Sequence, residues 1–308
     1  MDLKKQLSKK QVNGNSILTI GVFDGIHLGH LHLIKKLIQI ADQKKYLSGI
    51  ITFINHPAEI LNPQFNPSFI MDPNEKILAL EETGVDYVIP IIFNHSISNM
   101  SARSFIDDLQ NNLHMKGLVI GPDFAMGKNR EASASKLEEL GVYKKFSTEI
   151  ITPQDINGIP LRSTSVRNFL FSGDIENASK VLGRNFKISG IVIHGEERGR
   201  KLGYPTANLK VSPKIVTPEN GIYATFAYIN NKKFMSATSI GTNPTFKGAN
   251  KTIETYILNF DNDIYDQTIN IEFIKKLRDE IKFSSVEKLV NQMDTDIIKT
   301  EKILSRFQ

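Results

Sequence analysis

The sequence predicts two domains of different class: an α/β domain with a doubly wound parallel sheet, followed by an antiparallel β domain that ends in a helix. From residue 17 to about 184, short apolar runs alternate with helical patterns, which is typical of parallel strands covered by helices. After Arg184 the runs become strand-like with Gly- and Pro-rich joins, which favours an antiparallel barrel or sandwich. The length of 308 residues fits two domains of ~100 to 200 residues each. We place them at residues 1–184 and 185–308.

The composition is that of an ordinary globular protein and excludes several kinds of site. No apolar run approaches the ~20 residues that a membrane span needs, and the opening MDLKK leads into polar sequence rather than a signal-peptide core. We therefore expect a cytoplasmic protein without a membrane partner. The absence of cysteine excludes disulfides, thiolate zinc sites and cysteine nucleophiles. The net charge of +5 is dispersed along the chain, which favours nucleotides over nucleic acid as anionic partners.

The first domain is expected to contain five strands. Residues 17–23 are apolar and β-branched enough for a strand buried on both faces. The other strands are expected at residues 47–53, 86–93, 118–120 and 146–151. Apolar residues at helical spacing predict helices between them, at residues 31–41, after Asp72-Pro73, along residues 105–113, at residues 135–140, after Ser163 and after a cap at Asp174.

The second domain is expected to contain strands at residues 188–193, 222–229, 234–240, 252–258 and 268–273. Asn230-Asn231 predicts a tight turn between two of them. A final helix should begin near Ser284-Ser285, because a serine hydroxyl can cap it. Its apolar residues recur at helical spacing and should share one face: Leu289, Val290, Met293 and Ile297.

A glycine- and histidine-rich stretch follows the first strand, where GVFDGIHLGH occupies residues 21–30. Its glycines allow a sharp turn and close approach to a ligand. His30 should lie in the first turn of the next helix, where free N–H groups and the helix dipole favour an anion. His27, three residues earlier, can reach the same point. In a doubly wound sheet this turn falls at the carboxyl ends of the strands, where ligands bind.

This stretch resembles the H-x-G-H signature of the nucleotidyltransferase superfamily, in the longer form G-x-F-D-G-x-H-x-G-H typical of bacterial bifunctional riboflavin kinase/FMN adenylyltransferases. Two further segments resemble family motifs: residues 52–57 (T-F-x-x-H-P) and residues 121–127 (G-x-D-F-x-F-G). Met126 replaces the usual aromatic residue of the second, and Glu131-Ala132 replace a glycine-containing pair. Lys128 and Arg130 fit either solvated charges or ligand contacts.

Residues 163–167 resemble the family's S-T-x-I-R, which sets two hydroxyls at a helix start and Arg167 one turn later. An arginine fork matches phosphate oxygens and the helix start adds N–H donors, so we expect Arg167 to act with His27 and His30. Arg162 stands where the family more often has serine. The resemblance implies that the remaining nucleotide and flavin contacts of this domain come from Gly21, Phe23, Asp24, Gly25, Gly29, His56, Asp123, Phe124, Ser163 and Thr164.

The second domain resembles riboflavin kinases over sixteen residues, because residues 194–209 match H-G-x-x-x-G-R-x-L-G-[FY]-P-T-A-N-L. Thr206 and Asn208 are two residues apart, so on a strand they face the same side and could hold Mg²⁺ together with ATP phosphates. Segments at residues 221–224, 240–246 and 277–283 also resemble family segments. The resemblance implies further cofactor contacts from Gly195, Arg200, Gly203 and Asn243.

Glu254 is the expected catalytic base of this domain, within the matched segment at residues 252–256. The ribityl 5′-hydroxyl of riboflavin is neutral, and a carboxylate can accept its proton as it attacks the γ-phosphate of ATP. Tyr256 stands where the family often has histidine, and Asp266 where glycine is common.

The expected function is therefore phosphorylation of riboflavin to FMN, followed by adenylylation of FMN to FAD with release of pyrophosphate. The implied fold is a Rossmann-like domain of the H-x-G-H type joined to an antiparallel β-barrel kinase domain. One alternative is a single-activity FAD synthetase with a silent kinase-like domain, which Tyr256 and Asp266 suggest. A non-enzymatic flavin or nucleotide sensor is less favoured, because it would predict a concentrated basic face or stacking aromatics. The sequence does not indicate an oligomeric state.

Overall fold

The structure is a computed structural model that describes residues 2–8, 10–62, 64, 68–195, 199, 202–245 and 248–307, with backbone alone at residues 243–245 and 248–250. The chain divides into two compact units, Met1–Ser163 and Thr164–Gln308. No helix within the described part of the chain is both long and apolar enough to cross a membrane.

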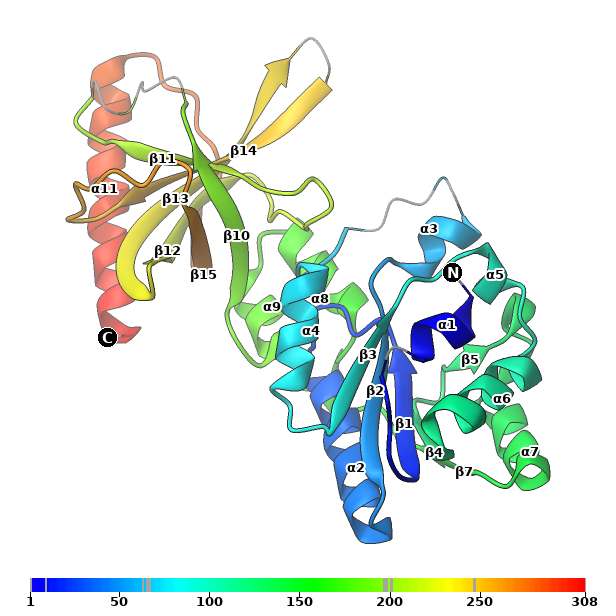
Figure 1. Ribbon diagram of the computed structural model, residues 1–308. Coiled ribbons are helices and arrows are strands. Elements are labelled where there is room, and N and C mark those ends of the chain that lie inside the picture. Colours follow the sequence, from blue (N-terminus) through cyan, green and yellow to red (C-terminus); the bar gives the residue numbers. More distant parts are fainter. Residues whose placement is uncertain are drawn as a thin grey trace. The chain divides into compact units, whose positions relative to one another are not determined.

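The first unit contains a five-stranded sheet in the order β3-β2-β1-β4-β7 (Figure 1). Every neighbouring pair in it is parallel, which confirms the predicted doubly wound sheet. The strands cover Ser16–Gly21 (β1), Leu47–Phe53 (β2), Tyr87–Ile91 (β3), Met115–Ile120 (β4) and Ser147–Ile150 (β7). Pro90 lies in β3, which is tolerated because β3 is an edge strand and proline cannot donate to a second neighbour.

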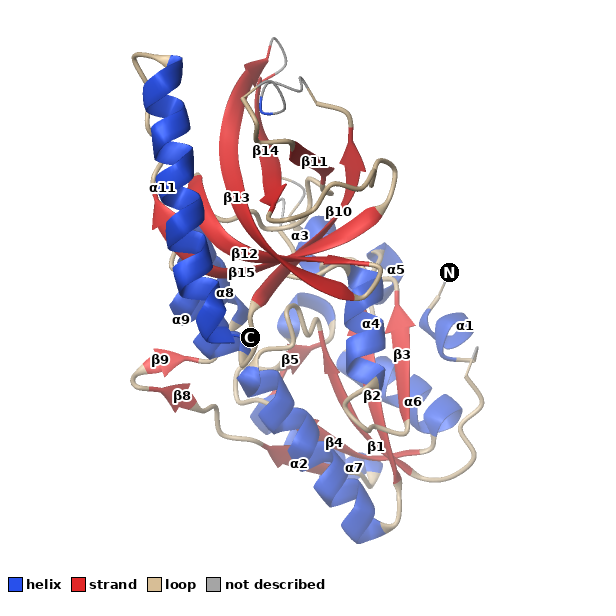
Figure 2. Cartoon of the chain, turned by 90° about the vertical axis from the view of Figure 1, so that its left-hand side faces the viewer, coloured by secondary structure: helices blue, strands red, loops and turns tan. Residues whose placement is uncertain are grey.

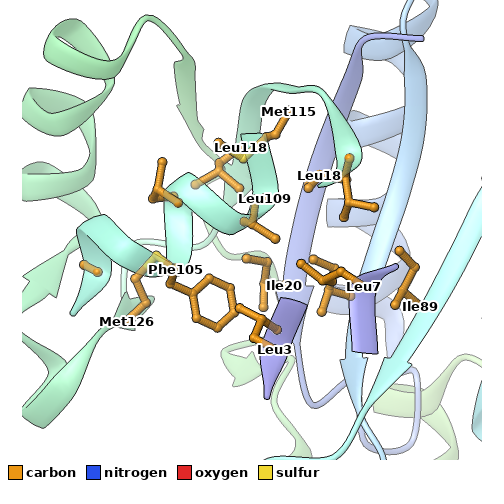
Figure 3. Close-up of a cluster of buried hydrophobic side chains, with 14 of the residues drawn as sticks. Leu3, Leu7, Leu18, Ile20, Ile89, Phe105, Leu109, Met115, Leu118 and Met126 are labelled. Carbon is orange, nitrogen blue, oxygen red and sulfur yellow. The ribbon is translucent and has the colours of Figure 1, made fainter. Parts of the chain in front are cut away.

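Helices cover both faces of this sheet. They span Leu3–Leu7 (α1), Leu28–Lys44 (α2), Pro57–Leu61 (α3), Pro73–Glu81 (α4), His95–Ser98 (α5), Ala102–Leu113 (α6) and Ala134–Lys144 (α7). On one face, Ile34 and Leu37 of α2 pack with strand residues such as Ile17. On the other, Leu3 and Leu109 pack with Ile20 and its neighbours (Figure 3). Because apolar layers lie on both faces, the strands read as continuous apolar runs.

The helix-start signals in the sequence predict the observed ends well. Asp72 caps α4 by accepting a hydrogen bond from the Asn74 N–H at 2.8 Å, with Pro73 in the first turn. Three short helices, α1, α3 and α5, are too brief for periodicity to reveal. The same holds for the small hairpins Ala125–Met126 (β5) with Ala132–Ser133 (β6), and Asp155–Ile156 (β8) with Ile159–Pro160 (β9), and for the single turn Lys128–Arg130 (η1).

The second unit is a closed barrel in the order β10-β11-β14-β13-β12-β15 (Figure 2). The strand pattern left a barrel and a sandwich open for this domain, whereas the family resemblance implied a barrel, and the closed order confirms the barrel. All pairings are antiparallel. Asn230 and Asn231 both have positive φ, 48° and 63°, as the predicted tight turn requires. The strands cover Phe186–Ile193 (β10), Thr206–Lys210 (β11), Gly221–Ile229 (β12), Lys232–Thr245 (β13), Gly248–Ile257 (β14) and Thr268–Arg278 (β15).

The helices of this unit are Ser163–Phe171 (α8), which begins at the last residue of the first unit, Ile175–Leu182 (α9) and Val286–Leu304 (α11), followed by the turn Ser305–Phe307 (η2). Asp174 caps α9 and Ser285 caps α11, as predicted. Helix α11 packs along β12, β13 and β15, on the outside of the barrel (Figure 2). It therefore forms one wall of any cavity between the helix and these strands.

Candidate active sites

The first candidate site lies where β1, flanked by β2 and β4, runs into helix α2. Three residues of the loop have positive φ, Phe23 (52°), Gly25 (76°) and Ile26 (40°). Positive φ is strained for a β-branched residue such as isoleucine, and such strain persists only where the surroundings hold it. A Cβ on Gly25 would lie 2.8 Å from Ile70 Cγ2, so the turn requires glycine here.

The two histidines meet at the start of α2, as predicted. His27 is the N-cap, and its Nδ1 accepts a hydrogen bond from the His30 N–H at 3.3 Å. The two rings stack with centroids 3.6 Å apart. Nδ1 of His30 is buried and has no hydrogen-bond partner among the described residues. An unpaired buried polar atom carries a free-energy cost, which a hydrogen bond to this nitrogen would remove.

The charge state of His30 follows from its surroundings. Burial, followed by the nearby positive charges of His27 and Lys76, holds the pKa of His30 well below its usual 6.5. His30 is therefore neutral at pH 7 in the ligand-free protein. In this state its ring offers one N–H donor and one acceptor nitrogen rather than a full positive charge.

A cavity of about 340 Å³ opens beside the histidines, within the size range of small-molecule sites. It gathers seven residues that the sequence singled out, His27, Gly29, His30, Asp123, Phe124, Arg162 and Ser163. Its other walls include segments 151–154 and Leu161, to which the sequence gave no signal. A Cβ on Gly29 would lie 2.7 Å from the Leu161 carbonyl oxygen, so glycine lets α2 begin against this wall.

Arg162, the departure from the family pattern, pairs with Asp123 at 2.9 Å, and both side chains are more than half exposed. The Arg130 guanidinium donates to the Asp123 carbonyl oxygen at 3.0 Å. Met126 is buried in the core beside Phe105 (Figure 3). Glu131 accepts a hydrogen bond from the Ala102 N–H at 2.7 Å. Met126 and Glu131, which also depart from the family pattern, therefore support the fold of the loop, whereas Arg162 lines the cavity.

Several predicted contact residues lie beneath the loop or away from the cavity lining. Phe23 and Asp24 are each only 2% exposed, and both Asp24 carboxylate oxygens accept from the Ile70 N–H, at 2.9 and 3.1 Å. Asp24 thus holds the neighbouring segment in place. His56 caps α3 through its Nδ1, 3.1 Å from the Ala58 N–H. Gly21 and Gly25 shape the turn but do not line the cavity.

The S-T-x-I-R motif straddles the two compact units. Ser163 belongs to the first, and its hydroxyl donates to the Asp24 carbonyl oxygen at 2.8 Å. Thr164, which is exposed, and Arg167, which is half-buried, belong to the second unit in helix α8. Their phosphate-binding roles stay predictions.

The second candidate site is centred on Glu254 of β14. Asn208 of β11 lies directly opposite Glu254 in the antiparallel ladder. Thr206 lies two residues earlier on the same strand, and its hydroxyl is 3.5 Å from Glu254 Oε2. A Cβ on Gly195 would lie 2.2 Å from Asn208 Nδ2. Gly195 therefore allows the segment after β10 to approach the Asn208 amide.

Two cavities adjoin this group and share Thr206. One, of about 300 Å³, contains Glu254 and Tyr256 and has a largely apolar wall from α11. That wall is the predicted helix face, contributing Leu289, Met293 and Ile297. The other, of about 270 Å³, lies against Ala207 and the loop 260–265. The His194 and Tyr265 rings stack 3.8 Å apart in this region. The Glu254 carboxylate thus lines a largely apolar cavity, and a more polar cavity adjoins that one at Thr206.

Arg278 and Asp296, to which sequence reasoning gave no role, also line the first of these cavities. The guanidinium binds the carboxylate through Nε and Nη2 at 2.7–3.1 Å. An acidic residue on the inner face of an otherwise apolar helix stripe was the signal that could have revealed Asp296. Asp266, which replaces a common glycine, has φ of 60°, a conformation that aspartate adopts more readily than most residues.

Two of the predicted contact residues of the second domain are not fully described by the structure. Arg200 lies outside the described residues, and Asn243 is described by its backbone alone. Gly203 has φ of 88°, in the left-handed region that favours glycine. Across the described part of the chain, no three His, Asp or Glu side chains gather as a ready metal site.

Comparison with known proteins assigns both units. The FAD synthetase family profile matches residues 9–165, and the riboflavin kinase family profile matches residues 182–304. The bifunctional riboflavin kinase/FMN adenylyltransferase of Buchnera aphidicola subsp. Schizaphis graminum is 39% identical, with 94% of each chain covered. The enzyme of the same description from Escherichia coli K12 is 33% identical, with 91% of this chain and 90% of that one covered.

Among solved structures, a protein described as a macrolide-efflux protein of Streptococcus pneumoniae matches with a TM-score of 0.88 at 30% identity, covering 96% of both chains. The two profiles follow the order of the two sites along the chain. The chain therefore belongs to the family of bifunctional riboflavin kinase/FMN adenylyltransferases.

Proposed function

We propose that this protein makes FAD from riboflavin in two ATP-dependent steps. Residues 185–308 transfer the γ-phosphoryl group of ATP to riboflavin, and residues 1–184 transfer the adenylyl group of a second ATP to the FMN produced. The observation that carries the proposal is the presence of two chemically distinct sites in one chain. One has a carboxylate at an apolar cavity, and the other has a histidine pair at a helix start.

In the kinase step, the 5′-hydroxyl oxygen of riboflavin attacks the γ-phosphorus of ATP and the bond to the bridging oxygen of ADP breaks. The hydroxyl proton passes to Glu254, whose carboxylate lines the apolar cavity. The flavin ring fits the apolar wall that α11 provides, because flat aromatic ligands bury apolar surface. ATP then occupies the adjoining cavity at Thr206 and loop 260–265. Tyr256 faces the flavin side and leaves the carboxylate in place.

In the adenylyl step, a phosphate oxygen of FMN attacks the α-phosphorus of ATP and the bond to pyrophosphate breaks. A phosphate monoester is largely dianionic near pH 7, with a second pKa of about 6, so no protein base is required. The dipole at the start of α2 and the His30 ring stabilise the charge on the phosphates. Arg167 stays a proposed phosphate ligand on the strength of its motif, since its guanidinium matches phosphate oxygens.

Thr206 and Asn208 suit Mg²⁺ as a partner of ATP, because their hydroxyl and amide oxygens are hard donors on one face of β11, opposite the Glu254 carboxylate. When bound there, Mg²⁺ would neutralise part of the charge on the ATP phosphates. Two donors alone make a weak site, which agrees with a metal that arrives bound to nucleotide. We therefore assign Thr206 and Asn208 to hold Mg-ATP.

The test is to incubate the purified protein with Mg-ATP and either riboflavin or FMN, and to separate the flavins by chromatography. We expect FMN and FAD from riboflavin, and FAD with equimolar pyrophosphate from FMN. Glu254→Gln should abolish phosphorylation of riboflavin while leaving FAD formation from FMN intact. FAD from FMN but no product from riboflavin would favour a single-activity FAD synthetase. No flavin product from either substrate would exclude the enzyme and leave the sensor.

A further inference from the structure

Lys76 is a buried lysine that neither candidate site uses. It lies in helix α4, and its side chain is 1% exposed. Its Nζ donates to the carbonyl oxygens of Val22 at 2.8 Å and Phe53 at 2.7 Å. A buried ammonium group is costly unless hydrogen bonds or charges compensate it. The two hydrogen bonds supply that compensation, and the burial of a lysine at this position requires an explanation.

The two carbonyl groups lie at the carboxyl ends of adjacent strands. Gly21 of β1 pairs with Thr52 of β2 at the last step of the parallel ladder, and Val22 and Phe53 each follow by one residue. The Thr52 hydroxyl also donates to the Val22 oxygen, at 3.2 Å. Lys76 thus bridges two strand ends where the ladder no longer holds them together.

The bridged segment leads directly into the strained turn. Positive φ occurs at Phe23, one residue after the carbonyl that Lys76 holds, and again at Gly25 and Ile26, directly before the cap His27. Within the turn, the Asp24 carboxylate accepts a hydrogen bond from the Ile70 N–H. A strained loop of this kind needs its surroundings to over-determine it. Lys76 and Asp24 are therefore two of the anchors that set the direction of the turn.

The charges around Lys76 agree with this geometry. Burial lowers the pKa of Lys76 to about 8, and the nearby Asp24 carboxylate opposes that shift. The group still carries its proton at pH 7. Lys76 in turn helps to lower the pKa of His30, so it is close enough to influence the site, although it does not line the cavity.

We propose that Lys76 is a positioning residue for adenylyl transfer: it ties the loop after β1 to the end of β2, so that His27 and the start of α2 face the cavity. The proposal rests on the proposed adenylyl activity of this unit. Lys76 touches carbonyl oxygens of the protein and not the reacting atoms, so removing it should lower the rate by misplacing groups that do.

The test compares Lys76→Met with wild type in the full-length protein. Methionine keeps the length and volume of the side chain but cannot bridge the carbonyls. We expect kcat for FAD formation from FMN to fall roughly 10²-fold, the effect of ~1 Å misplacement in an active site, with a smaller change in KM for ATP. Riboflavin phosphorylation in the same preparation should be unchanged, and the unfolding temperature should not fall.

Two further variants make the result specific. Lys76→Arg keeps a cationic donor and should retain more of kcat than Lys76→Met. If the methionine variant does not fold, a lower kcat of Lys76→Arg with an unchanged KM for ATP serves the same comparison. Lys36→Met, at an exposed position of α2, removes the same charge and should leave kcat unchanged.

A wild-type kcat in Lys76→Met would overturn the proposal. So would an equal loss of both activities accompanied by a lower unfolding temperature, since that would mean a purely structural role. A wild-type protein that makes no FAD from FMN would instead refute the proposed function, and so the two failures are distinguishable.

Discussion

Two histidines three residues apart have different environments at the start of helix α2. His27 is 4% exposed and accepts the His30 N–H with its Nδ1, so it closes the helix start. His30 has its own Nδ1 unpaired among the described residues and a lowered pKa. The residue that caps the helix is thus distinct from the residue whose ring nitrogen has no partner in the described part of the chain, and we expect His30 to act through hydrogen bonds more than through charge.

This difference predicts the outcome of two substitutions. His30→Ala removes a donor from the phosphate site and should lower kcat for FAD formation by about 10²- to 10³-fold, as the loss of one preorganised donor does in other enzymes. His30→Asn keeps an N–H donor of neutral charge and should retain more activity than alanine. Steady-state kinetics with FMN and Mg-ATP measure both. Equal losses would contradict a hydrogen-bonding role, and unchanged riboflavin phosphorylation is the internal control.

Lys76 predicts a particular dependence of stability on pH. Its pKa is about 8 in the folded protein against an ordinary 10.5. The unfolded chain therefore binds this proton more tightly between about pH 8 and 10.5, and the contribution of Lys76 to stability rises with pH across that window. The unfolding temperature of wild type, relative to Lys76→Met, should increase from pH 8 to pH 10. A difference that stays constant or shrinks over this range would contradict the lowered pKa.

At the scale of elements, a buried ion pair joins helix α11 to the barrel. Arg278 ends β15, and its side chain is 15% exposed, while that of Asp296 on α11 is 5% exposed. Gln292 donates a further hydrogen bond to Asp296 at 2.9 Å. Because the same helix supplies the apolar wall of the cavity at Glu254, its attachment and the shape of that cavity depend on each other.

Asp296→Ala leaves the Arg278 charge buried without its partner and should lower the free energy of unfolding by roughly 3–5 kcal/mol. It should also weaken riboflavin binding, measured by quenching of flavin fluorescence. Glu176→Ala is a matched control in the same unit, since Glu176 and Lys275 form an ion pair whose side chains are 58% and 46% exposed. Its cost should not exceed about 1 kcal/mol. Similar losses from both variants would show that the buried pair has no special role.

At the scale of the whole molecule, each described cavity is lined by residues of a single compact unit. The cavity beside the histidines is lined by residues of Met1–Ser163, and the two cavities near Glu254 by residues of Thr164–Gln308. The two reactions share FMN, which is the product of one and the substrate of the other. Inactivating one site should therefore leave the other able to use or supply free FMN.

A mixture of two inactive variants tests this independence. Glu254→Gln should make no FMN, and His30→Ala should make FMN but little FAD, so neither alone converts riboflavin to FAD efficiently. Mixed with riboflavin and Mg-ATP, they should form FAD after a lag, because FMN made by His30→Ala must accumulate in solution before Glu254→Gln binds it. Absence of FAD from the mixture, with each separate activity intact, would mean that FMN passes only within one chain.

Much of the fold could be predicted because local patterns carried it. Alternating apolar runs and helical spacing predicted the parallel sheet, and Asp72, Asp174 and the Ser284-Ser285 pair predicted where helices begin. Helices α1, α3 and α5 were missed because four or five residues show no period. The choice of a barrel over a sandwich was also left open by spacing, since it depends on β10 pairing with β15 across some 80 residues and not on any local signal.

The sequence by itself determined the two families of motif and the identity of the groups that meet at each site, because glycines, histidines and hydroxyls in fixed spacing act through local backbone geometry. The tertiary structure decided which of those groups reach a cavity: Asp24 and Phe23 turn inward to support the loop, whereas Arg162 lines the cavity and pairs with Asp123. It also decided the roles of Lys76 and of the Arg278–Asp296 pair. Their partners are distant in the sequence and meet them only in the folded chain. Spacing along the sequence therefore does not encode these contacts.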